Sequence, residues 1–327
     1  MVTPQTVLSV HDLSIQYPIA IGVVRAVESV SFTLAHGEAL GLVGESGCGK
    51  STLGLSLLKL LRPPGRVTEG RILYRGRDIL KMNENALLAL RGRNISMIFQ
   101  NPLTSLNPLF TVEHQFLETI HFHDPSTPRA RGLAAVEKMM ATLGIEKKRL
   151  REYPHQLSGG MRQRIMIGLA LIMNPDILIA DEPTTSLDVI VEAGFTELLA
   201  NLRRLYSLSV ILITHNLGLV AEIADRIAVM YGGKIVEVGP AARIFAQPLH
   251  PYTQGLINCI PNIQLDQKEL LTMPGSPPDL AAPPRGCRFA PRCPKVMPIC
   301  HEKTPQLVEY ASSHAAACWL HTNKKAP

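Results

Sequence analysis

Hydrophobic and polar positions follow two different periods along the chain. From residue 6 to about 100, short β-rich runs such as VLSVHDLSIQY, VVRAVESVSFTL and EALGLVG are separated by turn residues. Short runs of this kind are typical of strands, whereas the LGLSLLKLL that follows has helical spacing. This part of the chain is predicted to form a mixed sheet that leads into a loop and a helix.

Helical spacing dominates from about residue 102 to 172, in runs such as TVEHQFLETIHF and ARGLAAVEKMMATLGI. Because Pro and Gly separate these runs, a helical subdomain is predicted there. Residues 177–238 return to buried strands that alternate with helices, as in ILIAD and SVILITH. Such alternation predicts an α/β fold.

The composition changes again beyond about residue 248. Prolines gather in QPLHPYTQ and MPGSPPDLAAPPRG, and four cysteines follow them. Proline-rich sequence without periodicity is typical of loops. We therefore expect one domain over residues 1–247, with the helical subdomain at about 102–172, and a mostly loop extension over 248–327.

Composition and charge limit the classes of protein. The 327 residues are 46% hydrophobic and 18% charged, which suffices for a full core and argues against disorder. A net charge of +6 suits an anionic ligand, a nucleic acid or an acidic membrane surface without selecting among them. The sequence lacks an apolar run of roughly 18 residues and a recognisable signal peptide, so a cytoplasmic protein is expected.

The strongest chemical signal is GESGCGKST, which lies between an apolar strand and a helix. Phosphate oxygens need many backbone N–H donors, and glycines let the chain wrap closely around them. Lys50 is placed to reach the β- and γ-phosphates, Ser51 to ligate Mg²⁺, and Thr52 to add a phosphate contact. The nucleotide-binding residues expected in this loop are Gly44, Glu45, Ser46, Gly47, Cys48, Gly49, Lys50, Ser51 and Thr52.

A second signal is ILIADEPTTSLD, an apolar strand that ends in two adjacent carboxylates. Asp181 can hold Mg²⁺ through its water shell, and Glu182 can polarise the water that attacks the γ-phosphate. An exposed turn would explain one acid, but it explains a pair that follows a phosphate loop poorly. These two motifs together indicate a P-loop NTPase.

The segment PHQLSGGMRQR resembles the signature sequence of the ATP-binding cassette (ABC) ATPases, whose other elements occur here in the family's order. The matching positions are Tyr17 for the adenine-stacking aromatic, Gln100 for the Q-loop, Asp188 for the D-loop and His215 for the switch histidine. The resemblance covers residues 6 to about 240. It implies an ABC cassette with a mixed β subdomain, a RecA-like core and a helical subdomain. Asn216 departs from the aspartate usual after the switch histidine.

Ser158, Gly159 and Gly160 precede a helix, so they offer a hydroxyl and N–H groups at its positive end as a second phosphate site. The resemblance implies head-to-tail pairing, in which each ATP lies between one chain's phosphate loop and the other's signature. The implied catalytic residues are Glu182, His215 and Gln100, and the implied Mg²⁺ ligands are Ser51, Gln100 and Asp181.

Within the family, HPYTQGL, MPGSPPDL and GCRFAPRCP resemble the ATPase subunits of oligopeptide, dipeptide and nickel uptake systems. The resemblance implies a peripheral protein on the cytoplasmic face of the inner membrane. Its implied partners are two permeases, a second ATPase in a heterodimer and an extracytoplasmic binding protein, with no nucleic acid. Peptide uptake is the leading function; the alternatives are uptake of nickel or another small solute, and a regulatory or docking subunit that binds ATP without hydrolysing it.

Four cysteines of the extension form a candidate metal site: Cys287, Cys293, Cys300 and Cys318. Because a reducing compartment disfavours disulfides, clustered thiols suggest a metal. Zinc sites usually use closer cysteine pairs than these, which are separated by five, six and seventeen residues. Proline-bearing loops fit a bulkier group, and the resemblance implies a 4Fe-4S cluster in some family members. We therefore expect such a cluster, with zinc as the alternative and with the metal supplying much of the extension's folding energy.

Overall fold

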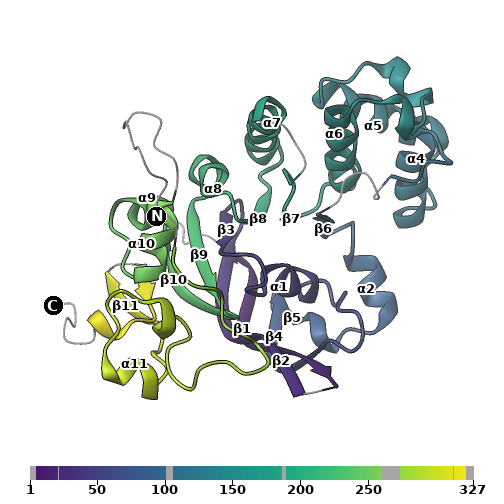
Figure 1. Ribbon diagram of the computed structural model, residues 1–327. Coiled ribbons are helices and arrows are strands. Elements are labelled where there is room, and N and C mark those ends of the chain that lie inside the picture. Colours follow the sequence, from purple (N-terminus) through teal and green to yellow (C-terminus); the bar gives the residue numbers. More distant parts are fainter. Residues whose placement is uncertain are drawn as a thin grey trace. The chain divides into compact units, whose positions relative to one another are not determined.

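The structure is a computed structural model of the whole chain. It describes residues 5–20, 22–100, 106–185, 189–259, 273–311 and 313–321. The chain divides into two compact units, one made of Met1–Lys81 with Leu212–Pro327 and the other of Met82–Ile211 (Figure 1). Each unit is described by itself.

The first unit contains an antiparallel sheet with the strand order β2-β1-β4-β5. Its strands are β1 (Thr6–Ile19), β2 (Gly22–Ala35), β4 (Arg66–Tyr74) and β5 (Arg77–Asp78). Alternate apolar residues of β1 and β2 face inward, and Ile15 pairs with Val27 with both side chains buried. The sheet forms because this alternation gives each strand one apolar face.

A second sheet of this unit contains the strand that leads into the phosphate loop. In it, β3 (Ala39–Val43) runs parallel to β9 (Arg226–Tyr231), which pairs antiparallel with β10 (Lys234–Pro240). All five residues of β3 are buried, as its unbroken apolar sequence requires.

The extension continues this sheet beyond β10. There, β12 (His314–Ala316) pairs with β10, and β11 (Val308–Ala311) pairs with β12. The fully buried carboxylate of Glu237 on β10 accepts hydrogen bonds from the backbone N–H groups of Leu249 and His250, and lies 2.8 Å from Nε2 of His314. The expected loops thus contain strands that join the cassette sheet.

Short helices complete the first unit. They are α1 (Lys50–Ser56), α8 (Leu217–Ile223), α9 (Ala241–Ala246), α10 (Pro251–Asn258) and α11 (Pro298–Glu302), with 3₁₀ turns at Ile79–Lys81, Ala290–Arg292 and Trp319–His321. The strand β8 (Ser209–Thr214) spans the boundary between the units.

The second unit holds the expected helical subdomain. Its elements are β6 (Ile95–Ile98), parallel to β7 (Ile177–Asp181), with α2 (Glu84–Leu90), α4 (Val112–His123), α5 (Arg129–Thr142), α6 (Gly159–Leu171), α7 (Val189–Tyr206) and 3₁₀ turns at Lys147–Arg151 and Pro154–Gln156. Helices α4, α5 and α6 pack against one another (Figure 1). The Thr111 hydroxyl caps α4 by accepting from the N–H of His114.

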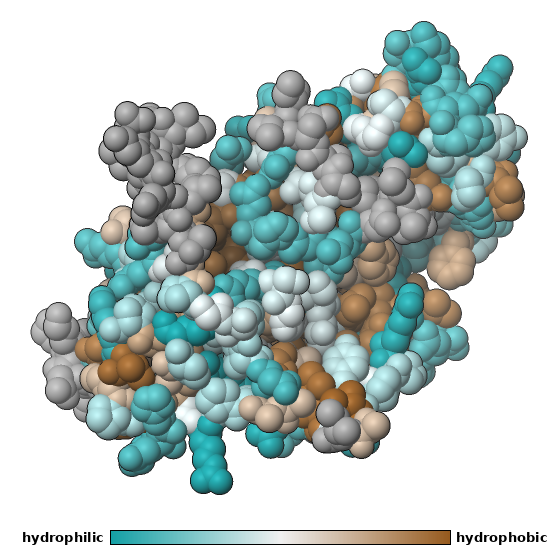
Figure 2. All heavy atoms as spheres, in the orientation of Figure 1, coloured by the Kyte–Doolittle hydropathy of each residue, from teal (hydrophilic) through white to brown (hydrophobic). Residues whose placement is uncertain are grey.

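Hydrophilic side chains cover much of α4, α5 and α6 on the face drawn in Figure 2, with small hydrophobic groups between them. Among the described residues, we find no helix with the length and apolar character that crossing a membrane requires.

Candidate nucleotide site

The loop between β3 and α1 spans residues 44–49 and approaches its neighbouring strands too closely for a side chain at two of its glycines. A Cβ on Gly44 would lie 2.2 Å from the carbonyl oxygen of Met230, and a Cβ on Gly49 would lie 2.1 Å from that of Ala26. Gly49 also has a φ of 100°, a conformation that favours glycine. Close approach between the loop and its neighbouring strands therefore requires these glycines.

Lys50 begins α1 and turns its ammonium group back into the loop. The residue is 5% exposed, and Nζ donates to the carbonyl oxygens of Gly44 at 2.8 Å and Glu45 at 3.0 Å. Ser51 and Thr52 follow in the first turn and are half-buried. The loop and the start of α1 thus bring a cation and two hydroxyl groups together.

Cys48, the cysteine of this loop, is buried. Burial raises the pKa of its thiol, against the opposing effect of the Lys50 charge and hydrogen bonds. The thiol therefore stays protonated at neutral pH, so a contact from Cys48 to a phosphate would have to come from its backbone rather than from a thiolate.

The two predicted acids lie in the second unit, at the end of β7. Asp181 is 5% exposed and Glu182 is 8% exposed. Glu182 has a φ of 47°, which costs a residue with a Cβ roughly 1 kcal/mol. The Thr185 hydroxyl donates to Oε2 of Glu182 at 3.1 Å and orients the carboxylate. Backbone strain at a buried acid is typical of a functional position.

The signature residues lie at the start of α6, in the same unit. Ser158 is the N-cap, and its hydroxyl oxygen accepts from the N–H of Met161 at 3.3 Å. Ser158 and Gly159 are exposed, Gly160 is half-buried, and a Cβ on Gly159 would meet no atom within 4 Å. The start of this 13-residue helix is therefore accessible to an anion.

Gln163 is a functional candidate that the sequence pattern does not reveal. Its side chain is 2% exposed, and Nε2 donates to the carbonyl oxygen of Pro183 at 2.7 Å. This bond joins the signature helix to the residue that follows Glu182. A buried glutamine inside a helix is a weak sequence signal, because the pattern does not show its distant partner.

The smaller motif residues have well-defined surroundings. Tyr17 is half-buried, and a Cβ on Gly65 would lie 2.4 Å from its ring, so the ring packs over the Gly65 backbone. Gln100 is exposed two residues after β6, and His215 is exposed directly after β8. Asp188 lies outside the described residues.

Asn216, which stands where the family usually has aspartate, has a structural role. Its side-chain oxygen accepts from the N–H groups of Gly218 at 2.9 Å and Leu219 at 3.3 Å, which caps α8. Because asparagine caps a helix about as well as aspartate, the substitution keeps this turn.

The predicted metal centre in the extension is wrong. All four cysteines are described, yet the described part of the chain holds no group of three or more His, Cys, Asp or Glu side chains placed to bind a metal ion. Burial raises the pKa of the Cys287, Cys293 and Cys318 thiols, that of Cys318 to about 11, so they are protonated at neutral pH. Neither the 4Fe-4S cluster nor zinc is supported.

Side-chain packing and ion pairs, rather than the expected metal, hold the cysteine-bearing segment in place. Phe289 is 2% exposed, and its ring centroid lies 5.1 Å from that of Tyr231 and 5.5 Å from that of Tyr252. Arg288 is buried and donates to the carbonyl oxygen of Gly232 and to Glu28. Spacing between cysteines could not reveal these contacts.

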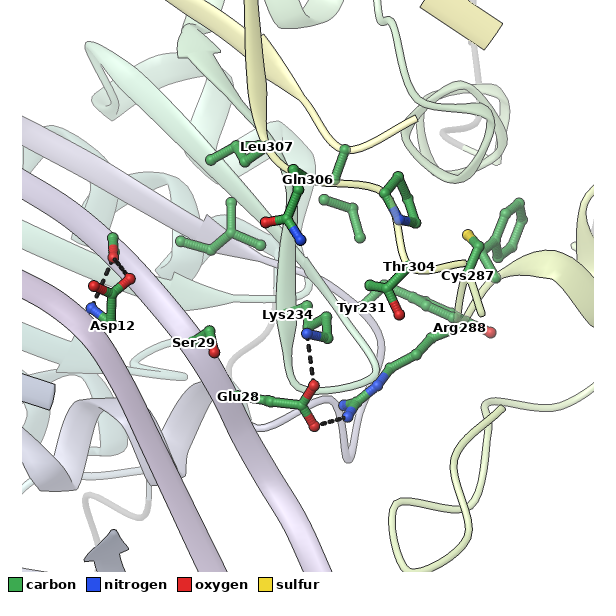
Figure 3. A pocket seen from close by; sticks show the side chains of 16 residues that line it. Asp12, Glu28, Ser29, Tyr231, Lys234, Cys287, Arg288, Thr304, Gln306 and Leu307 are labelled. Atoms are coloured by element: carbon green, nitrogen blue, oxygen red, sulfur yellow. Dashed lines mark hydrogen bonds and ion pairs between the residues drawn. The ribbon is translucent and has the colours of Figure 1, made fainter. Parts of the chain in front are cut away.

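Figure 3 shows this region, where Glu28, Lys234 and Arg288 converge beside a cavity of about 320 Å³. Nζ of Lys234 lies 2.7 Å from Oε1 of Glu28. Burial alone would raise the pKa of Glu28, but the hydrogen bond from Lys234 and the Arg288 and Lys234 charges outweigh it and lower the pKa. The ion pairs therefore persist at neutral pH.

Comparison with solved structures places the fold in a known class. The ATP-binding cassette MJ0796, in a dimeric post-hydrolysis state bound to ADP and phosphate, matches with a TM-score of 0.64 at 24% identity, over 72% of this chain and 98% of that chain. This likeness, with the phosphate loop, the acid pair and the signature helix, defines an ATP-binding cassette. The predicted fold class is confirmed.

The family follows from the sequence comparisons. The "ABC transporter" family model matches residues 27–185, and "Oligopeptide/dipeptide transporter, C-terminal region" matches residues 236–300. The dipeptide transport ATP-binding protein DppD of Bacillus subtilis is 48% identical over 97% of this chain and 95% of that protein. The oligopeptide transport ATP-binding protein OppD of Salmonella typhimurium is 45% identical over 95% and 93%. The chain belongs to the ABC transporter ATP-binding proteins of the oligopeptide/dipeptide type.

Proposed function

We propose that this chain hydrolyses ATP to drive the uptake of dipeptides or oligopeptides through a membrane ABC importer. The observation that carries the proposal is the match to DppD across 97% of the chain, which includes the extension as well as the cassette. The charged groups Lys50, Asp181 and Glu182 support it, because all three are buried, and burial strengthens their interaction with a charged ligand.

ATP binding is the task of the phosphate loop. Backbone N–H groups of residues 44–49 surround the phosphates, and Nζ of Lys50 exchanges its loop carbonyl partners for the β- and γ-phosphate oxygens. The Tyr17 ring stacks on the adenine. A buried lysine strengthens this interaction because water screens its charge less than that of an exposed one.

The available donor groups fit Mg²⁺, which prefers oxygen ligands. Ser51, the residue after Lys50, offers a hydroxyl, Gln100 offers an amide oxygen, and Asp181 offers a carboxylate. These three residues would hold the ion, which would neutralise charge that develops on the phosphate oxygens.

Glu182 acts as the general base. Its carboxylate accepts a proton from water while the water oxygen attacks the γ-phosphorus and the bond to the ADP oxygen breaks. His215 contacts the γ-phosphate. The products are ADP and inorganic phosphate, and Thr185 keeps the carboxylate oriented throughout.

The signature acts on the nucleotide of a second ATPase subunit. Ser158, Gly159 and Gly160 present a hydroxyl and helix N–H groups to the γ-phosphate held by the partner's loop. Asp188, at the position of the D-loop, is proposed as a further nucleotide-binding residue. ATP therefore joins the two subunits, and hydrolysis separates them.

The remaining partners belong to the same proposal. Two permease subunits form the path across the membrane, a second, related ATPase completes a heterodimer, and an extracytoplasmic binding protein delivers the cargo. The chain then lies on the cytoplasmic face of the inner membrane as a peripheral subunit, and nucleic acid has no role.

The test of the cargo uses the assembled transporter in lipid vesicles. ATP hydrolysis is measured with the binding protein alone and with dipeptides, longer peptides or nickel chelates added. Stimulation by peptides supports the proposal. If only nickel chelates stimulate hydrolysis, the cargo is nickel rather than peptides. If the assembled complex binds ATP without hydrolysing it, the chain is a regulatory subunit.

A further inference from the structure

Glu45 belongs to the phosphate loop, yet a residue of the extension holds its side chain. Arg292 lies in the 3₁₀ turn Ala290–Arg292, and its Nη1 and Nη2 donate to Oε2 and Oε1 of Glu45 at 2.7 and 3.0 Å. Such a two-point contact between guanidinium and carboxylate fixes orientation as well as distance.

Arg292 is itself held firmly in place. The residue is 9% exposed, Nε donates to the carbonyl oxygen of Pro274 at 2.8 Å, and Nη1 also lies 3.3 Å from the hydroxyl of Tyr231. The hydrogen bonds to Glu45 raise the pKa of Arg292 further above its usual range, so the charge is permanent. A side chain with this many partners has little freedom to move.

Tyr252 holds the backbone of the same loop residue. Its hydroxyl oxygen accepts from the N–H of Glu45 at 2.8 Å, and the residue is fully buried. The ring packs against Tyr231 and Phe289, with centroid distances of 4.5 and 5.5 Å. The extension therefore fixes Glu45 at two points.

Glu45 connects this contact to Lys50. The carbonyl oxygen of Glu45 accepts from Nζ of Lys50 at 3.0 Å. Movement of Glu45 would shift an atom that touches the phosphate-binding ammonium group.

We propose that Arg292 and Tyr252 are positioning residues for ATP binding: they fix Glu45 and thereby hold the phosphate loop in its binding conformation. The inference rests on the proposed ATPase function. A loop that is already ordered loses less conformational entropy when it binds a ligand, so loosening it weakens nucleotide binding. The extension is then part of the nucleotide-binding apparatus.

The experiment measures ATP affinity of the full-length chain and KM for ATP in the assembled transporter, for wild type, Arg292→Gln, Glu45→Gln and Tyr252→Phe. We expect each variant to raise KM by at least about fivefold, the loss expected for one charge-assisted or buried hydrogen bond. The limiting rate at saturating ATP should change less. The double variant Glu45→Gln, Arg292→Gln should raise KM no more than the single variants, because both act through one contact.

Two matched controls separate positioning from general stability. Arg226→Gln breaks another Arg–Glu contact of the same unit, at 2.8 Å to Glu38, and Tyr310→Phe removes another extension hydroxyl. Both controls should keep the wild-type KM, whatever they do to the melting temperature. If wild type binds and hydrolyses ATP while Arg292→Gln and Tyr252→Phe keep its KM, the inference is wrong. If wild type itself neither binds nor hydrolyses ATP, the proposed function fails first.

Discussion

Lys50 and Glu182 are both buried, and the proposed mechanism gives them different roles. Burial reduces solvent screening, so each interacts more strongly with a charged substrate than an exposed residue would. In the proposed mechanism Lys50 binds the negative charge that the ATP phosphates carry before the reaction. In the proposed mechanism Glu182 takes a proton from the attacking water during hydrolysis, so removing its carboxylate should lower the rate of hydrolysis rather than the affinity for ATP.

Replacing Glu182 by Gln tests this division. The amide keeps the size of the side chain but cannot accept the proton, so hydrolysis at this site should fall by about 10²-fold or more. ATP affinity should stay near that of wild type, and the ATPase pair should remain closed on ATP. The measurements are single-turnover hydrolysis and nucleotide binding. Glu197→Gln, an exposed position on α7, is the control, and near-normal turnover in Glu182→Gln would refute the assignment.

Among the helices, α10 begins at a capping histidine, His250, whose side chain can gain a proton. Nδ1 of His250 accepts from the N–H of Tyr252 at 3.0 Å, which requires a neutral ring nitrogen. Burial, and to a smaller extent the nearby His321, lowers the pKa of His250 to about 3. Below its usual pKa of about 6.5, the unfolded chain binds a proton that the folded chain excludes.

Stability should therefore fall as pH decreases from about 6.5 towards 3, by up to about 1.4 kcal/mol per pH unit from His250. His250→Asn keeps a capping side chain without titrating. Thermal unfolding at pH 7.5 and pH 5 should show a smaller loss of melting temperature in the variant than in wild type. Equal losses in both proteins would exclude His250 as the source.

Sequence predicted elements well where local pattern decides them. The phosphate loop, the acid pair and the signature helix each combine a short motif with its flanking strand or helix, and the predicted ABC family is confirmed by the comparisons. The strands β11 and β12 were not expected, because VEYA and HAA are too short to show a period. They form because β10 offers them a pairing edge.

The sequence pattern cannot predict contacts between residues that are far apart along the chain. Arg292 and Glu45 are 247 positions apart, and Gln163 meets Pro183 through the folded chain. The cysteine spacing suggested ligands, whereas the fold organises that segment through Phe289 and Arg288. The roles of the site residues and the domain boundary at 247 stay predictions.

In the whole molecule, strand pairing, ion pairs from two buried arginines and an aromatic cluster hold the extension to the cassette. These contacts should suffice without a metal. Replacing all four cysteines of the extension by Ala should leave a folded protein, with ATP hydrolysis within about twofold of wild type and a small loss of stability from the buried Cys300.

Elemental analysis of the wild-type protein accompanies this variant. We expect less than one iron or zinc per chain. If the wild-type protein contained stoichiometric metal and the alanine variant were unfolded, folding of the extension would depend on a metal after all.

ATP hydrolysis by this chain should drive peptide uptake, and this coupling is measured as uptake of a labelled dipeptide into vesicles that contain the assembled transporter. The binding protein is supplied outside and ATP inside. We expect uptake to require ATP, and we expect Glu182→Gln in this chain to abolish uptake while the complex stays assembled. Uptake at the wild-type rate with Glu182→Gln, or ATP hydrolysis with no peptide uptake by the wild-type complex, would contradict it.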